Sequence, residues 1–275
     1  MPAHIIFLTL FAALLHASWN ALLRSGTDRL WSMTIMCVTI AVTCGVIALF
    51  LPLPDFASAK YAVLSGLLHV GYNLCLIRSY QSGDLGQTYP IARGSSPLMV
   101  TCGAALFAGE KIAFNTLVGI ALISGGILML AMRSRKLAIP GLKYPLATGA
   151  FIAAYSVVDG IGVRVSGNSF SYTVWMSMLW GVLMPALYIA LRDTKSLLRW
   201  RPGLLSAAAG GVVSLLAYGM IIYAMVAAPM GAVSALRETS VLFAAVLGYL
   251  FLGETLTLRK MLACAVIATG TLLIG

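Results

Sequence analysis

Apolar runs of about 20 residues, separated by short polar links, account for almost the whole sequence. Ten such runs lie near residues 4–24, 30–51, 59–80, 85–107, 113–132, 142–163, 169–191, 203–226, 230–251 and 256–275. A helix of about 20 apolar residues crosses the roughly 30 Å hydrocarbon core of a bilayer. Only 9% of the residues are charged, against about 25% in soluble domains. The sequence therefore predicts an all-α membrane protein with ten transmembrane helices, and it excludes a soluble enzyme or nucleic-acid-binding domain.

Basic residues gather on one side of this predicted topology. The links after odd-numbered runs contain thirteen Lys and Arg residues, and the links after even-numbered runs contain three. Cytoplasmic loops carry the excess of Lys and Arg, so the count predicts periplasmic termini for a multi-pass protein of a bacterial inner membrane. The same bias explains most of the net charge of +10 without a nucleic-acid partner.

Neither a removable leader nor a cofactor site is expected. The first run has no small-residue cleavage site before Trp19 and Asn20, which predicts a retained span. The five cysteines fall inside runs and lack C-x-x-C or His/Cys ligand spacing, so we expect no metal and no disulfide. The sequence has no phosphate-binding loop or nucleotide fingerprint, so ATP hydrolysis is not the expected energy source.

An internal repeat divides the chain into two parts. Around an offset of 144 residues, four pairs align without a gap: Arg93 with Arg237, Ser96 with Ser240, Gly109 with Gly253, and Glu110 with Glu254. Each part contains five runs, an odd number, so the second copy must enter the membrane from the opposite side. The sequence thus predicts two inverted five-helix repeats, residues 1–137 and 138–275, in a single membrane domain.

With these motifs the chain resembles the drug/metabolite transporter superfamily, specifically its EamA branch of ten-helix transporters. The stretches His16-Ala-Ser-Trp-Asn20 and Tyr89-Pro-Ile-Ala-Arg93 also resemble that branch. Their sequences are similar to those of members associated with bacterial phosphonate use. The resemblance covers essentially the whole chain. It implies a secondary transporter of small metabolites, not an enzyme, with a central cavity between its halves. Members are often drawn with cytoplasmic termini, opposite to the charge count.

Ionisable side chains at bilayer depth are functional candidates, because each costs several kcal/mol in hydrocarbon. Four lie inside runs: Arg93, Asp159, Arg237 and Glu238. Residues three or four apart share a helix face, and polar side chains do so in several runs. The predicted substrate-binding residues are His16, Trp19, Asn20, Tyr72, Asn73, Tyr89, Arg93, Ser96, Tyr155, Asp159, Arg237 and Ser240. For the charged members, an internal salt bridge is the structural alternative.

The acidic residues are expected to have two different roles. Asp159 and Glu238 are candidates for carrying a coupling proton, and the neighbouring Arg237 makes Glu238 the poorer carrier. Glu110 and Glu254 each lie in a short turn between two runs. We expect each to cap the helix that follows it, because a helix N-terminus favours negative charge.

These features predict a secondary active transporter that moves a small metabolite by alternating access, as a monomer or homodimer. Two arginines can bind a carboxylate, phosphate or phosphonate, which favours an anionic or zwitterionic substrate. A lipid-linked sugar flippase of the same fold and a non-transporting membrane scaffold remain the alternatives. Small residues are dense in 113–132 and 256–275, which predicts close helix approach and would suit a dimer interface.

Overall fold

The chain is almost entirely helical in the computed structural model, which describes residues 1–24, 28–82, 85–131, 142–199, 202–252 and 257–275. Within these ranges there are twelve helices and no strand. The helices are α1 (Ala3–Arg24), α2 (Arg29–Ala48), α3 (Phe56–Ser82), α4 (Leu85–Ala108), α5 (Phe114–Ala131), α6 (Lys143–Val165), α7 (Ser169–Leu191), α8 (Thr194–Leu198), α9 (Leu204–Ala227), α10 (Met230–Glu238), α11 (Ser240–Leu252) and α12 (Leu258–Ile274). The predicted boundary between the two repeats, at 137/138, lies outside the described residues.

The helices differ from the predicted runs in two places. The run 230–251 is divided into α10 and α11 at Thr239. There the Thr239 hydroxyl donates to the Leu236 carbonyl at 2.6 Å, and the Thr239 N–H donates to the same carbonyl at 3.1 Å. A turn closed by this hydrogen bond between residues three apart therefore interrupts the helix, although the run stays apolar. The short α8 between α7 and α9 is also additional, and its N-cap residue is Asp193.

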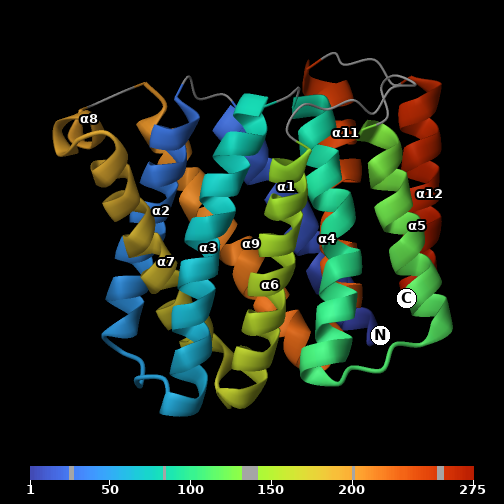
Figure 1. The fold of residues 1–275 in the computed structure, drawn as a ribbon, viewed down its shortest axis with the longest axis horizontal. Helices are drawn as coiled ribbons and strands as arrows, with labels where there is room; N and C mark the ends of the chain where they lie inside the picture. Colours follow the sequence, from blue (N-terminus) through green and yellow to red (C-terminus); the bar gives the residue numbers. More distant parts are fainter. Residues whose placement is uncertain (25–27, 83–84, 132–141, 200–201, 253–256) are drawn as a thin grey trace.

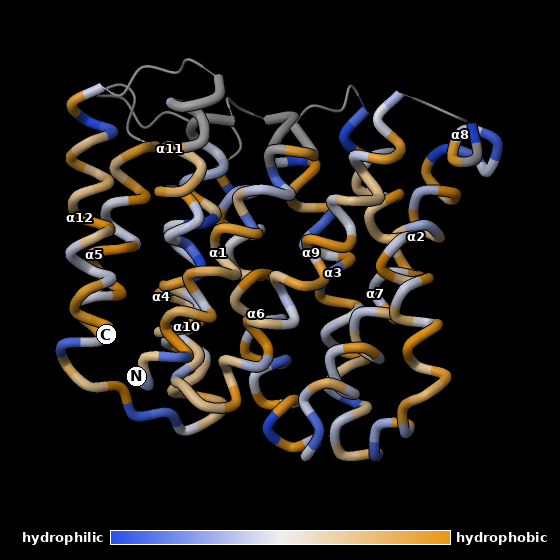
Figure 2. The backbone as a smooth tube through the Cα atoms, turned by 180° about the vertical axis from the view of Figure 1, so that it is seen from behind, coloured by the Kyte–Doolittle hydropathy of each residue, from blue (hydrophilic) through white to orange (hydrophobic). Residues whose placement is uncertain are grey.

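Helix length and composition identify a membrane protein. Six of the described helices are long and apolar enough to cross a bilayer: α1, α2, α5, α6, α7 and α9. The helices lie side by side in one bundle (Figure 1). Figure 2 shows the most hydrophilic residues concentrated towards the two ends of the bundle, with apolar residues between them. This distribution matches a bundle that lies across a membrane.

Helix packing repeats between the two halves. The contact of α3 with α6 corresponds to that of α9 with α1, and the contact of α2 with α9 corresponds to that of α7 with α3. The contact of α4 with α6 likewise corresponds to that of α1 with α10 and α11. Three further contacts join counterparts directly: α2 with α7, α4 with α10, and α5 with α12. The principal contacts between the halves therefore keep their partners when the halves are exchanged, whereas the packing of α4 on α5 has no counterpart of similar extent among the described residues.

The two halves run in opposite directions. In Figure 1, α5 rises from the lower edge of the bundle, whereas its counterpart α12 descends beside it to the C-terminus. The N-terminus lies near the C-terminus in the lower half of the same view. This arrangement is the one expected for an inverted repeat with five helices in each copy.

Two glycines allow α5 and α12 to cross at very short range. A Cβ atom added to Gly119 would lie 2.7 Å from the Gly270 carbonyl oxygen, and one added to Gly270 would lie 2.7 Å from the Gly119 carbonyl oxygen. The contact is thus reciprocal, as expected where two repeats meet across a pseudo-twofold axis. Small residues of these two helices pack on each other within one chain.

Replacing Gly119 with alanine should destabilise the protein by about 1–3 kcal/mol, because the added methyl group meets backbone that cannot rotate away. Gly125→Ala is the matched control, since it lies on the same helix and its added Cβ has no atom within 4 Å. That control should be neutral or stabilising by up to about 1 kcal/mol, because alanine favours the helix. Thermal unfolding in detergent measures both. Equal stability of the two variants would contradict the close crossing.

Candidate functional site

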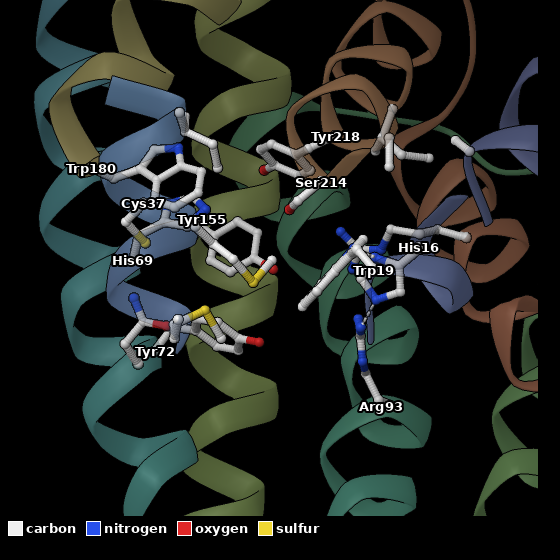
Figure 3. A pocket seen from close by; sticks show the side chains of 18 residues that line it. His16, Trp19, Cys37, His69, Tyr72, Arg93, Tyr155, Trp180, Ser214 and Tyr218 are labelled. Atoms are coloured by element: carbon white, nitrogen blue, oxygen red, sulfur yellow. Dashed lines mark hydrogen bonds between the residues drawn. The ribbon is translucent and has the colours of Figure 1, made fainter. Parts of the chain in front are cut away.

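A cavity lies between the two halves of the bundle, and both halves line it. It encloses about 750 Å³ between the side chains, its open mouth included. Figure 3 shows eighteen lining side chains, which come from α1–α4 in the first half and from α6, α7, α9 and α10 in the second. The lining residues are Ala12, His16, Trp19, Met33, Met36, Cys37, Ile40, His69, Tyr72, Asn73, Arg93, Tyr155, Trp180, Ser214, Ala217, Tyr218, Ile221 and Arg237.

Two buried arginines share one carboxylate at one end of this cavity. Arg93 Nη1 lies 3.1 Å from Glu238 Oε1, and Arg237 reaches the same oxygen through Nε at 3.2 Å and Nη2 at 3.0 Å. The exposed fractions of Arg93, Arg237 and Glu238 are 4%, 2% and 0%. Glu238 Oε2 has no hydrogen-bond partner in the described part of the chain. The two equivalent arginines of the repeat thus meet at the interface between the halves.

Helix α4 is locally adapted around Arg93. Pro97 lacks the N–H that would otherwise bond the Arg93 carbonyl one turn earlier. The Ser96 hydroxyl donates to that carbonyl instead, at 3.2 Å. The Tyr89 ring lies 5.4 Å from the Arg93 guanidinium carbon, within cation–π range. These contacts fix the arginine from its own helix.

His16 of α1 lies beside the arginines. The Trp19 indole N–H donates to His16 Nδ1 at 3.2 Å, and Arg93 Nη2 contacts His16 Nε2. A neutral imidazole has only one acceptor nitrogen, so these two donors compete for His16. A ligand that accepts a hydrogen bond from Arg93 or Trp19 would resolve this competition.

The opposite end of the cavity is aromatic. The His69 ring stacks on Tyr155, with centroids 4.1 Å apart, and on Trp180, with centroids 5.3 Å apart. Tyr72 and Tyr218 meet the Tyr155 ring edge-on at 5.7 and 6.0 Å. In Figure 3 these rings lie across the cavity from Arg93, His16 and Trp19. The cavity therefore has a cationic end and an aromatic end.

Asp159 lies directly behind the aromatic end. Its side chain is fully buried, and it accepts hydrogen bonds from Tyr172 at 3.1 Å and from Tyr218 at 2.6 Å. Among the described residues it forms no ion pair with Lys or Arg. Asp159 does not line the cavity, but Tyr218 does. The carboxyl group thus reaches the cavity through a tyrosine hydroxyl.

The structure brings seven of the twelve predicted substrate-binding residues to the cavity wall. They are His16, Trp19, Tyr72, Asn73, Arg93, Tyr155 and Arg237. The residues are contributed by α1, α3, α4, α6 and α10. Polar side chains that were predicted to share helix faces, from both halves of the chain, therefore lie around one cavity.

The other five predicted residues lie behind the cavity wall. Asn20 donates to the His16 carbonyl of its own helix at 2.8 Å, and the Ser240 hydroxyl is buried without a partner among the described residues. Tyr89 and Ser96 support Arg93, and Asp159 bonds to Tyr218, as described above. None of these five side chains lines the cavity.

Several wall residues were not predicted. Met33, Met36, Cys37 and Ile40 of α2 line the cavity, but an apolar residue that faces a cavity has the same sequence pattern as one that faces lipid. Ser214 and Tyr218 of α9 are also new. Their spacing of four residues places them on one helix face, a signal that the sequence did contain.

Glu110 caps a helix from the other half of the chain. Its carboxylate accepts the Met230 N–H at 2.9 and 3.2 Å, so it lies at the N-terminus of α10 and not of the following helix, α5. Arg164 Nη2 lies 2.6 Å from the same carboxylate, and this arginine also donates to two carbonyls near the end of α9. Gly109, at φ +64°, gives the preceding turn a left-handed residue. Glu254 lies outside the described residues.

The helices and the cavity define a transporter-like membrane protein that is built from two repeated halves. The chain belongs to the EamA-like transporter family, within the drug/metabolite transporter superfamily: the family model matches residues 4–132 and again 139–275. A solved crystal structure of a protein superposes with a TM-score of 0.76 at 19% identity, covering 99% of this chain and 96% of the other. That similarity supports the fold alone. No curated protein sequence matches this chain.

Proposed function

We propose that this protein is a secondary active transporter that carries a small anionic or zwitterionic metabolite across a bacterial inner membrane by alternating access. In this proposal α1 to α7, α9, the α10–α11 pair and α12 form ten spans, and residues 1–137 and 138–275 form the two halves. The cavity between the halves supports it, because a site at a repeat interface can open to either side as the halves rock. The excess of basic links supports periplasmic termini.

The observation that carries this proposal is a charge imbalance in the cavity. Arg93 and Arg237 are buried, and they share the single carboxylate of Glu238. Asp159 forms no ion pair with either arginine among the described residues, and its oxygens accept hydrogen bonds from tyrosines instead. One positive charge thus lacks an anionic partner among the described residues, and an unpaired buried charge is costly. An anionic ligand between the arginines would provide that partner.

A thermal-shift screen of detergent-purified protein tests this proposal. The panel contains amino acids, organic acids, phosphonates, sugars, nucleosides and cationic drugs. A ligand at a hundredfold its Kd should stabilise the protein by about 2.7 kcal/mol. We expect an anionic or zwitterionic compound to give this shift, and Arg93→Ala and Arg237→Ala to abolish it.

Arg78→Ala is the control for these variants, because Arg78 is an exposed arginine of α3 outside the cavity. It should retain the full ligand-induced shift. A shift that survives Arg93→Ala and Arg237→Ala would assign the arginines a structural role. No shift with any compound would favour the lipid-linked sugar flippase or the scaffold.

A further inference from the structure

Tyr218 connects the buried Asp159 to the cavity. Its hydroxyl donates to Asp159 Oδ2 at 2.6 Å, and its side chain lines the cavity together with Ser214, one turn earlier on α9. Figure 3 shows Tyr218 and Ser214 next to each other at the cavity. Tyr172 occupies the other carboxylate oxygen, Oδ1, at 3.1 Å, and it is itself buried. Oδ2 is therefore the Asp159 oxygen that is bonded to a cavity-lining side chain.

The hydrogen-bonding capacity of Tyr218 depends on Asp159. A phenol has one proton to donate, whereas an ionised carboxylate only accepts. When Asp159 is ionised, Tyr218 donates its proton to Oδ2, so the cavity meets only the lone pairs of the tyrosine oxygen. When Asp159 carries a proton on Oδ2, it can donate to that oxygen, and the Tyr218 proton turns to the cavity. Ionised Asp159 thus makes this end of the cavity an acceptor.

We propose that Tyr218, backed by ionised Asp159, binds the ammonium group of a zwitterionic substrate while Arg93 and Arg237 bind its anionic group. This inference rests on the proposed transport function and deepens it. The nearby rings of Tyr155 and Trp180 suit a cation, because the faces of tyrosine and tryptophan rings attract positive charge. The ammonium group and a proton on Asp159 compete, so substrate binding releases that proton to water, and protonation favours substrate release.

Polar and charged groups face Asp159 and its neighbour Tyr155 from the helices packed against α6. Tyr172 of α7, Tyr218 of α9 and Ser65 of α3 are the hydrogen-bond partners of Asp159. His69 of α3 stacks on Tyr155, and Arg93 of α4 and Arg237 and Glu238 of α10 lie near Tyr155. The arginines and Glu238 belong to the cationic end, where His16 also lies. A change of protonation at the cationic end changes the binding of a ligand's anionic group. A change of protonation of Asp159 changes the binding of its ammonium group.

Pairs of acids that differ only in an amino group separate these two ends. Glycine and acetate, β-alanine and propionate, and L-phenylalanine and 3-phenylpropionate are compared by thermal shift between pH 5 and pH 8. We expect tighter binding of the amino member, and we expect the affinity ratio within a pair to rise with pH by up to about tenfold per unit while Asp159 ionises. A pH dependence that arises from His16 or the arginines affects both members of a pair equally, because both carry the anionic group, and it therefore cancels in this ratio.

Tyr218→Phe removes only the hydroxyl and should bring the ratio close to one. Tyr223→Phe is the matched control, because Tyr223 lies on the same helix and is 52% exposed; it should leave the ratio unchanged. Asp159→Asn should make the ratio independent of pH. A ratio that is already constant with pH in the unmodified protein would overturn the proposal, even if Tyr218→Phe fails to fold.

The outcomes also separate this proposal from the transport function. Equal binding of both members of a pair, lost in Arg93→Ala, would overturn the ammonium site and leave the anion site standing. A preference for the amino member that persists in Tyr218→Phe would also overturn it. Absence of binding by every acid of both kinds would count against the substrate class and the proposed function together.

Discussion

Glutamine in place of Glu238 should lower the free energy of unfolding by about 3–5 kcal/mol, the cost of leaving buried charge without its partner. Glutamine keeps the size and one acceptor oxygen of the native side chain, so packing is preserved. It removes the negative charge that Arg93 and Arg237 share at 3.0 to 3.2 Å. Two buried arginines would then face each other without a carboxylate. Thermal unfolding in detergent measures the loss.

The double variant Arg237→Gln/Glu238→Gln tests whether charge causes this loss. It leaves one arginine in place of two, so part of the lost stability should return relative to Glu238→Gln alone. With Arg237→Gln alone as the second single variant, the set completes a double-mutant cycle, in which contacting residues show a coupling energy. If Glu238→Gln unfolds at the temperature of the unmodified protein, the arginines do not depend on this carboxylate.

Helix positions could be predicted because a bilayer requires long apolar segments whose backbone groups bond within the segment. The division between α10 and α11 could not, since it depends on hydrogen bonds of Thr239 to the Leu236 carbonyl. Threonine in an apolar run is compatible with a continuous helix. The break therefore has no signal in hydropathy or spacing.

The cationic end of the site followed from the sequence for a physical reason. A charged residue inside an apolar run needs a protein partner or water, so Arg93 and Arg237 had to face the interior. The repeat placed them at equivalent positions in the two halves. Their shared partner, Glu238, was also within a run, but the sequence did not show that Asp159 would be bonded to tyrosines.

Contacts between distant segments were the part that sequence reasoning missed. Glu110 was expected to cap the helix after its own turn, and its carboxylate bonds instead to the Met230 N–H, 120 residues away. The apolar cavity wall of α2, which includes Met36 and Ile40, was missed for the same reason. Periodicity shows which residues share a face, but only the packed structure shows what that face meets.

Asparagine in place of Asp159 should abolish uptake driven by a pH gradient and spare the exchange of labelled for unlabelled substrate. Asparagine cannot carry the proton, but its carbonyl oxygen accepts a hydrogen bond and its amide donates one. The hydroxyls of Tyr172 and Tyr218, which now donate to the carboxylate, can therefore both stay hydrogen-bonded. Proteoliposomes loaded with the compound found by thermal shift measure the two activities separately. We expect at least about a tenfold loss of gradient-driven uptake, because coupling requires a group that changes protonation state.

Asp193→Asn is the control, because Asp193 is an exposed acid at the start of α8 and should transport like the unmodified protein. Exchange can persist in Asp159→Asn because it needs only a loaded carrier on each side of the membrane. A weaker hold on the ammonium group would raise the substrate concentration that exchange requires. Gradient-driven uptake at the level of the unmodified protein would remove Asp159 from the coupling mechanism. Loss of both activities in a folded variant would instead make Asp159 essential for binding, because without a bound substrate neither half of the cycle proceeds.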